Sequence, residues 1–492
     1  MRKPTLQILP IMLAAMLIGA FIPTPPALAQ SSLSRDPKDR DRKDQEISEL
    51  KNEIRLLEHR VETLEGLDQK VRVIDRKLEV QAETQQVKAQ EAPIIKADAQ
   101  GFSISSANPD DWQLKFGGII QADGRFFTSG DDKSPSTFYL NRVRPILSGT
   151  LWKYYDFNIT PDFGQGKVVL QDAYINDRYF QQAQLQVGKY KAPFDLERLQ
   201  SDRDLLFSER ALTINLAPNR DTGAELHSDL FDGRLTYQFA VMNGVPNNTA
   251  SVDIDNNDAK DFIGRLFAQP FKHSEYQWAK GLGFGFAATY GDESNNTTSV
   301  YKTYGQSTWF SYNKGVTAAG ARFRFSPQAY YYAGGFGLLT EYVSDRHELN
   351  RNIQLKEGSF FKYVNDYETF ADSGYSMQGS YLLTGEDASY YTIKPYHPFD
   401  PRHGTWGAWE IAARISNLAT DRGQFKLNFA DPTVSAESAT EYDLGINWYL
   451  SQNVKWQFDY ARTFFNGGAG VTSAIKDRRD ESVFETQLQI AF

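Results

Sequence analysis

From Gln113 to the last residue, Phe492, hydrophobic and polar side chains alternate with a period of two. In residues 114–125, the even positions are Leu, Phe, Gly, Ile and Ala, whereas Lys115, Gln121 and Asp123 occupy the other face. Alternation of this kind predicts β-strands, because successive side chains of a strand point to opposite faces of the sheet. The pattern predicts sixteen strands, at 113–127, 137–150, 153–163, 167–180, 183–191, 220–231, 233–243, 260–270, 280–291, 317–332, 335–345, 373–384, 406–419, 439–450, 453–465 and 483–492.

The connections between these strands alternate between short and long. Tight turns are expected at 150–153, 180–183, 231–233, 332–335 and 450–453, and longer excursions at 128–136, 192–219, 244–259, 292–316, 346–372, 420–438 and 466–482. This asymmetry, with strands of about 9–11 residues or more, is typical of outer-membrane barrels. Two connections, 271–279 and 385–405, are longer than that rule expects.

A soluble antiparallel sandwich would also alternate. Aromatic residues near strand ends, at 152–155, 179–180, 330–332 and 448–449, favour the membrane alternative, because such girdles lie at lipid interfaces. A sheet that crosses a bilayer must close, since every backbone polar group has to be paired within the protein. We therefore expect an all-β protein, with a 16-stranded antiparallel transmembrane β-barrel at 113–492 that encloses an aqueous lumen.

The chain before the barrel has a different pattern. Residues 1–29 resemble a secretory signal peptide, with Arg2 and Lys3, an apolar run over 11–22, and a small-residue cleavage site at 27–29. An uncleaved anchor is the alternative. Residues 30–43 are polar and are predicted to form a flexible leader.

Residues 44–88 are predicted to form an α-helical coiled coil in the periplasm. Its seam has spacings of three and four and consists of Ile47, Leu50, Ile54, Leu57, Val61 and Leu64, followed by Leu67, Val71, Ile74 and Leu78. The step from Leu64 to Leu67 is a stammer. Because so narrow a stripe cannot bury itself alone, an oligomer is expected; a single helix lying on another surface is the alternative. The seam residues by themselves favour two strands. Residues 89–112 are predicted to be a linker.

The amino-acid composition argues against several classes of function. The 492 residues include no cysteine, which excludes disulfides, thiol catalysis and cysteine metal sites. Aromatics reach 14% although hydrophobic residues are only 41%, which suits a protein with an apolar outside and a polar inside. A net charge of -9 with no basic face gives no support for nucleic-acid binding. The six scattered histidines indicate no metal site, and no cofactor is expected.

An enzyme is the competing class, since some outer-membrane hydrolases are barrels. The chain has no Gly-x-Ser-x-Gly elbow, no P-loop and no HExxH motif. Asp253, Asp255 and Asp258 could suggest calcium, but their loop lacks the glycine and the terminal glutamate of an EF-hand, and a solvated Asp/Asn loop is favoured. We therefore expect no enzymatic activity.

Several stretches resemble the phosphate-selective porin O and P family of Gram-negative outer membranes. They are LNRVRPILSGTLWKYYDFNITPDFGQGKVVLQDAYI (140–175), LQVGKYKAPFDLERLQSDRDLLFSERAL (185–212), APNRDTGAEL (217–226), SPQAYYYAGGFGLLTEYV (326–343) and WGAWEIAARISNL (406–418). The resemblance implies a homotrimer of sixteen-stranded barrels in outer-membrane lipid, with a third loop folded inward and a lumen lined with Arg and Lys. Some members carry an N-terminal coiled coil, which here favours three strands over two.

A few charges in a narrow pore set its selectivity, because low-dielectric walls concentrate their field. The candidate pore and anion-binding residues are Arg142, Arg144, Lys189, Lys191, Arg198, Arg203, Arg210, Arg220, Arg322 and Arg324, and Arg265 and Arg414 could extend them. The third loop, 192–219, opposes five acidic residues to three arginines, and so carries no clear positive ladder.

The sequence therefore predicts a water-filled channel for inorganic anions or small polar solutes, with a preference for anions or phosphate set by the loop 192–219 and the lumen cations. Two alternatives remain open. One is a general, non-selective diffusion porin. The other is a structural tether that joins the outer membrane to peptidoglycan through the coiled coil.

Overall fold

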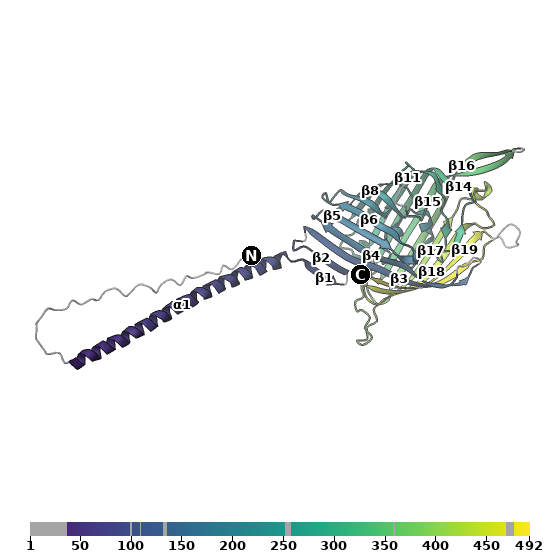
Figure 1. Cartoon of the computed structure of the whole chain (residues 1–492). Coiled ribbons are helices and arrows are strands. Elements are labelled where there is room, and N and C mark those ends of the chain that lie inside the picture. The colour runs from purple at the N-terminus through teal and green to yellow at the C-terminus, as the bar shows by residue number, and fades with distance from the viewer. Residues whose placement is uncertain are drawn as a thin grey trace. The chain divides into compact units, whose positions relative to one another are not determined.

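The computed structural model describes residues 37–98, 101–108, 110–130, 135–250, 257–357, 360–468 and 477–492. The chain divides into two compact units, Met1–Ala89 and Gln90–Phe492, which are treated separately below (Figure 1). The predicted signal peptide, residues 30–36 of the predicted leader, and Asp253 and Asp255 lie outside the described residues, and the rest of the leader is helical instead of flexible.

The first unit contains one long helix, α1 (Pro37–Glu91). Proline is well placed at the start of a helix, because its missing N–H would have no partner there in any case. The apolar seam is open to solvent within a single chain; Ile47, Leu57 and Leu64 are 49%, 57% and 63% exposed. None of the helices in the described ranges is long and apolar enough to cross a membrane.

The second unit is a closed antiparallel barrel of sixteen strands in the described residues (Figure 1). The strands are β3 (Trp112–Ser129), β4 (Thr137–Leu151), β5 (Tyr155–Asp162), β6 (Val169–Asp177), β7 (Gln184–Lys191), β8 (Arg220–Leu230), β9 (Leu235–Met242), β10 (Asp261–Ala268), β11 (Leu282–Thr297), β14 (Val316–Ala333), β15 (Phe336–Glu357), β16 (Phe360–Leu382), β17 (Ala408–Ala419), β18 (Ala436–Tyr449), β19 (Val454–Gly467) and β20 (Glu481–Ala491). Each strand pairs with the next, and β20 pairs with β3 to close the barrel. The predicted all-β, 16-stranded antiparallel fold is confirmed.

Alternation along the strands sorts side chains between lipid and lumen. On β3, Phe116 and Ile120 are 46% and 43% exposed on the outer face, whereas Gln121 and Asp123 are 0% and 2% exposed inside. An apolar outer surface and a polar interior are what a barrel in a bilayer requires. The hydrophobic effect therefore favours the membrane as the surrounding medium, and polar contacts organise the interior.

Aromatic side chains stack across neighbouring strands near the short-turn end of the barrel. Trp409 of β17 pairs in register with Trp448 of β18, which pairs with Trp456 of β19. Their rings stack at centroid distances of 4.9 and 6.3 Å. Such a ladder of large amphipathic rings matches the interfacial girdle predicted from the strand ends.

Two regions differ in form from the sequence-based prediction. The segment predicted as a linker contains β1 (Ile94–Asp98) and β2 (Gly101–Ser105), and β2 continues the sheet by pairing with β3. The excursion predicted at 346–372 is mostly strand, because β15 and β16 remain paired out to Glu357 and Phe360. A hairpin that satisfies its own backbone hydrogen bonds can extend beyond the barrel wall in this way.

Short elements occupy the connections. They are η1 (Gly164–Gly166), α2 (Leu196–Leu199), η2 (Leu212–Leu216), α3 (Gln277–Lys280), β12 (Tyr301–Lys302), β13 (Thr308–Phe310) and α4 (Gly423–Lys426). Of these, α2 and η2 belong to the loop 192–219, and β12 and β13 belong to the loop 298–315. Both loops contribute to the interior of the barrel, as described next.

Candidate functional site: the barrel lumen

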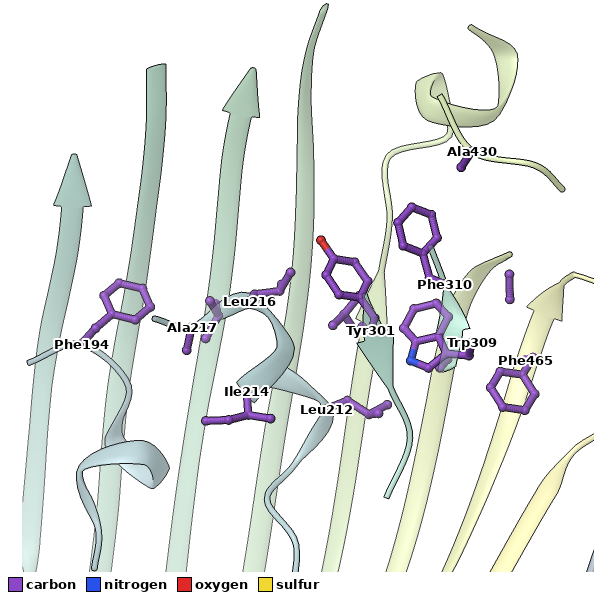
Figure 2. Close-up of a cluster of buried hydrophobic side chains, with 14 of the residues drawn as sticks. Phe194, Leu212, Ile214, Leu216, Ala217, Tyr301, Trp309, Phe310, Ala430 and Phe465 are labelled. Atoms are coloured by element: carbon purple, nitrogen blue, oxygen red, sulfur yellow. The ribbon is translucent and has the colours of Figure 1, made fainter. Parts of the chain in front are cut away.

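The loop 192–219 folds into the barrel. Asp195 starts α2 as its N-cap, with its carboxylate accepting the Arg198 N–H at 2.6 Å. Further along the loop, Leu212 and Leu216 of η2 are 1% and 0% exposed, and they share a buried apolar cluster with Trp309 of the loop 298–315. Figure 2 shows these side chains in front of the strands, where the two loops meet. Apolar contacts between the two loops therefore hold both of them inside the barrel.

Polar side chains of the wall bind the backbone of the same loop. Gln121 of β3 and Gln489 of β20 donate to the carbonyls of Asp202 and Arg203, at 3.1 and 3.0 Å. Lys455 of β19 donates to the Leu205 carbonyl at 2.8 Å. Because these donors come from separate strands, the loop is fixed across the lumen. The expected inward fold of the third loop is therefore present in the structure.

Two acidic residues of this loop pair with arginines of the barrel wall. Glu197 pairs with Arg414 of β17 at 3.1 Å, and Glu209 pairs with Arg125 of β3 at 2.8 Å. Arg198 and Arg210, in contrast, line a cavity next to β4 and β8. The acidic excess of the loop is thus partly neutralised by wall arginines, although Glu209 also lines the cavity where the loop's own arginines gather.

That cavity, which we call the basic chamber, has a volume of about 220 Å³. Its charged lining residues are Arg142, Arg144, Asp162, Lys167, Arg198, Asp202, Glu209, Arg210 and Arg220. Six are cationic and three are acidic, so the chamber carries a positive excess. Amides of Asn141, Gln165, Gln171, Asn219 and Gln306 complete its polar lining.

Asp202 is the acidic centre of the basic chamber. It pairs with Arg144, with Arg210 at 2.8 Å, and with Arg142 at 3.6 Å. Burial alone would raise the pKa of its carboxyl group, but these guanidinium groups outweigh burial and hold that pKa well below its usual value. Asp202 therefore stays ionised and ties the loop to β4.

Arg198 has a different environment. Its Nη2 donates to the Asn248 side chain at 2.6 Å, and its Nε has no hydrogen-bond partner among the described residues. No carboxylate of the described residues lies within ion-pair distance of it. Of the cations in the chamber, Arg198 thus retains hydrogen-bonding capacity that a bound anion could use.

A second cavity of about 300 Å³, which we call the polar chamber, adjoins the first. Its lining consists of Asn158, Asp172, Tyr174, Gln186, Tyr190, Lys191, Leu199, Glu225, His227 and Gln238. Asp172 of this chamber accepts two hydrogen bonds from Arg220 of the basic chamber, at 2.9 and 3.2 Å. Lys191 lies beside Arg220 in the strand register and donates to the Gln200 carbonyl at 2.7 Å.

The structure therefore brings together six of the ten candidate residues. Arg142, Arg144, Arg198, Arg210 and Arg220 line the basic chamber and Lys191 lines the polar chamber. Lys189 is buried in β7, and Arg203 lies beside Asp204 at 3.6 Å.

Arg322 and Arg324 lie apart from both chambers. Arg322 pairs with Asp345 at 2.7 Å and with Glu293, and Arg324 pairs with Asp261 at 3.3 Å. Arg324 is 0% exposed. These two arginines are enclosed by carboxylates and hold neighbouring strands and loops together.

Sequence reasoning did not single out Asp172, Tyr174, Tyr190 or Glu225. The available signal was alternation, which places Asp172 and Tyr174 on one face of β6, but nothing in the sequence says that this face meets the loop 192–219. Among the described residues, no cluster of three or more His, Asp or Glu side chains is arranged to hold a metal ion.

A closed barrel with an apolar outer face, and a polar lumen narrowed by an inward loop, defines an outer-membrane porin. Such a protein is a channel and not an enzyme, and it resides in the outer membrane. The family model for phosphate-selective porin O and P matches residues 114–492, and the chain belongs to this family.

The chain is also similar to individual proteins. Porin O of Pseudomonas aeruginosa is 24% identical over 430 residues, which cover 78% of this chain and 90% of that protein. Among solved structures, the trimer form of OmpT from Vibrio cholerae has a TM-score of 0.49 at 10% identity, over 78% of this chain and 100% of that one. The channel DcaP of Acinetobacter baumannii has a TM-score of 0.47 at 10% identity, over 78% and 98%.

Proposed function

We propose that this porin passes small anions and prefers phosphate, along a path beside β4–β8 that leads through the basic chamber and past Lys191 into the polar chamber. The observation that carries the proposal is the excess of cations over acids in the basic chamber, six against three. In a narrow pore with low-dielectric walls, such an excess concentrates anions and excludes cations.

The chemistry of the chamber supports phosphate in particular. A guanidinium group offers a planar fork of donors that fits two phosphate oxygens, whereas the single spherical chloride ion has no pair of acceptor atoms to match that fork. Arg198 has an unpartnered Nε, and Arg142 lies 3.6 Å from its acidic neighbour Asp202, so both have capacity left for an anion. Partial neutralisation by Asp202 and Asp172 keeps each site weak, which allows the anion to leave quickly.

The proposal can be tested by phosphate block of chloride current in planar bilayers. Arg198→Gln should raise the half-blocking phosphate concentration by about ten-fold, which corresponds to the loss of one charge-assisted hydrogen bond of about 1.4 kcal/mol. Arg422→Gln is the matched control, because Arg422 is 71% exposed and pairs with Glu437 outside both chambers. Equal block of both variants and the wild type would contradict the role of the basic chamber.

We further propose that three copies assemble in outer-membrane lipid. In support, β5, β7, β9 and β10 have eight residues each, which is short for a strand of about 9–11 residues that faces lipid. The part of the barrel formed by these short strands is better suited to contact with neighbouring barrels than to contact with acyl chains.

The proposed order of segments is a signal peptide (1–29), a leader (30–43), a periplasmic coiled coil (44–88), a linker (89–112) and the barrel (113–492). The open apolar seam of α1 supports an oligomer. Chemical cross-linking of the purified protein in detergent would test the number of copies; a monomer at every protein concentration would overturn this proposal.

A further inference from the structure

The polar chamber contains side chains that are not required for the binding of inorganic phosphate. Three amides, of Asn158, Gln186 and Gln238, and two aromatic rings, of Tyr174 and Tyr190, line it together with two carboxylates. Amides and rings in one cavity are suited to a solute that has both hydroxyl groups and C–H faces, because amides exchange hydrogen bonds and ring faces pack against carbon.

Two details show unused binding capacity in this chamber. The Gln186 side chain hydrogen-bonds to none of the described residues, although it lies on the lumen face of β7 between Asn176 and Glu225 in the strand register. The Tyr190 hydroxyl is also without a hydrogen-bond partner, and the Tyr190 ring contacts that of Tyr174 at 6.0 Å and 79°. Polar groups without partners at a cavity wall are candidates for ligand contacts.

The carboxylates restrict which part of a solute can occupy the chamber. Glu225 accepts a hydrogen bond from Gln238 at 2.8 Å, and Asp172 is neutralised by Arg220 from the other chamber. A second phosphate placed here would meet the charge of Glu225, which disfavours it. The group that fits is uncharged and rich in hydroxyls.

The two chambers are placed so that one solute can reach both. Arg220 and Asp172 are bonded to each other across the border, and Lys191 stands beside Arg220 in the register. A phosphate held by the other cations of the basic chamber, close to this border, would therefore leave its ester substituent in the polar chamber. At about 300 Å³ this chamber is at the lower end of the size range of small-molecule sites.

We infer that the channel prefers phosphate monoesters of small polyols, such as glycerol phosphate or a sugar phosphate, over inorganic phosphate, with the phosphate in the basic chamber and the polyol against Gln186, Tyr174 and Tyr190. This inference rests on the proposed anion function and names its class of solute.

The experiment compares four solutes as blockers of chloride current through the full-length porin in planar bilayers: inorganic phosphate, glycerol phosphate, glycerol and phosphocholine. The expected result is that glycerol phosphate blocks at about five-fold lower concentration than phosphate, which corresponds to about one additional neutral hydrogen bond. Glycerol alone should not block, because it has no charge for the basic chamber.

The variant Gln186→Met removes the amide and conserves approximate side-chain volume. In this variant, the half-blocking concentration of glycerol phosphate should rise to that of inorganic phosphate, whereas the half-blocking concentration of inorganic phosphate should not change. Gln184→Met is the matched control, since Gln184 lies on the same face of β7 but outside the chamber lining. This variant should keep the five-fold difference between the half-blocking concentrations of glycerol phosphate and inorganic phosphate.

The outcomes separate the two proposals. If inorganic phosphate does not block the wild type, the proposed anion function fails. If phosphate blocks but glycerol phosphate is no better, or if Gln186→Met keeps the difference, only the ester inference is overturned. Stronger block by phosphocholine than by glycerol phosphate would also overturn it, because the chamber would then favour an ammonium group.

Discussion

Arg220 and Asp172 form a two-point ion pair at the border of the two chambers, with Nε to Oδ1 at 2.9 Å and Nη2 to Oδ2 at 3.2 Å. The pair joins β8 to β6 on the path that we propose for anions. Because a bidentate partner occupies most of the fork of Arg220, this arginine offers little to a passing anion while Asp172 is charged.

Replacement of Asp172 by asparagine should therefore strengthen anion binding. In Asp172→Asn the guanidinium of Arg220 keeps its charge and loses its anionic partner, so the half-blocking phosphate concentration should fall by about three- to ten-fold. Chloride conductance should fall as well, since a deeper site slows exit. Titration of single-channel current with phosphate measures both effects, and weaker block in the variant would contradict this role.

The pH response of the loop 192–219 follows from Asp202. Arg144 and Arg210 hold the pKa of this carboxyl well below its usual value despite burial, so its ion pairs are fully present above the unfolded pKa of about 3.9. They are lost only as the pH falls through the lower, folded-state value. The anchoring of the loop by Asp202 should therefore be the same at pH 7 and pH 5, and should weaken only below about pH 4.

Asp202→Asn should reproduce the low-pH state at neutral pH. With the charge removed, Arg144, Arg142 and Arg210 lose their common partner, and the loop should fluctuate more. We expect higher conductance and more open-channel noise at pH 7, recorded from single channels. A variant that matches the wild type in both quantities would contradict the anchoring role.

Arg322 should affect stability and not selectivity. In Arg322→Gln, Glu293 would lose its arginine partner and Asp345 would lose the nearest of its cationic partners, and breaking a buried pair in this way costs about 3–5 kcal/mol. The denaturation temperature of the barrel in detergent should fall, whereas the reversal potential should stay at the wild-type value. A shift in reversal potential away from the wild-type value would place Arg322 on the conduction path instead.

The sequence was sufficient for the wall of the barrel, and the reason is physical. Lipid outside and water inside impose strict alternation. The polarity of residues such as Phe116 and Asp123 therefore predicts whether the side chain points to the lipid or to the lumen. Alternation does not limit the length of a hairpin beyond the membrane, which is why the paired strands at 346–357 and 360–372 were predicted as a loop. The short hairpin of β1 and β2 was too brief for its alternation to be recognised.

The site was only partly predictable, because charge counted along a segment does not show where each charge points. The loop 192–219 has an acidic sum, yet Glu197 pairs with Arg414 outside the basic chamber while Arg198 lines that chamber. Likewise, Arg324 looks like a lumen cation in sequence but is fully enclosed. Only the packing of the loop against particular strands shows which charged residues line the proposed anion path and which form structural ion pairs.

The helix α1 should contribute to assembly and not to conduction. Deletion of residues 37–89 removes the exposed apolar seam but leaves the barrel unit whole, so single-channel conductance should be unchanged. Oligomers of the shortened protein should dissociate at a lower temperature in detergent, because a paired seam would no longer hold them.

Sedimentation with peptidoglycan, compared between the full-length and shortened proteins, would separate tethering from assembly. Equal sedimentation of both would argue against a cell-wall contact through α1. Loss of conductance on deletion would contradict the assignment of the helix to assembly alone.

The most direct test of the central claim is the reversal potential of the wild-type porin in a planar bilayer under a KCl gradient, with phosphate then added. We predict a reversal potential on the chloride side and block of the chloride current by phosphate, because cations outnumber acids in the basic chamber. A reversal potential near zero or on the potassium side, with no phosphate block, would contradict the anion function and indicate a general diffusion porin on the same barrel.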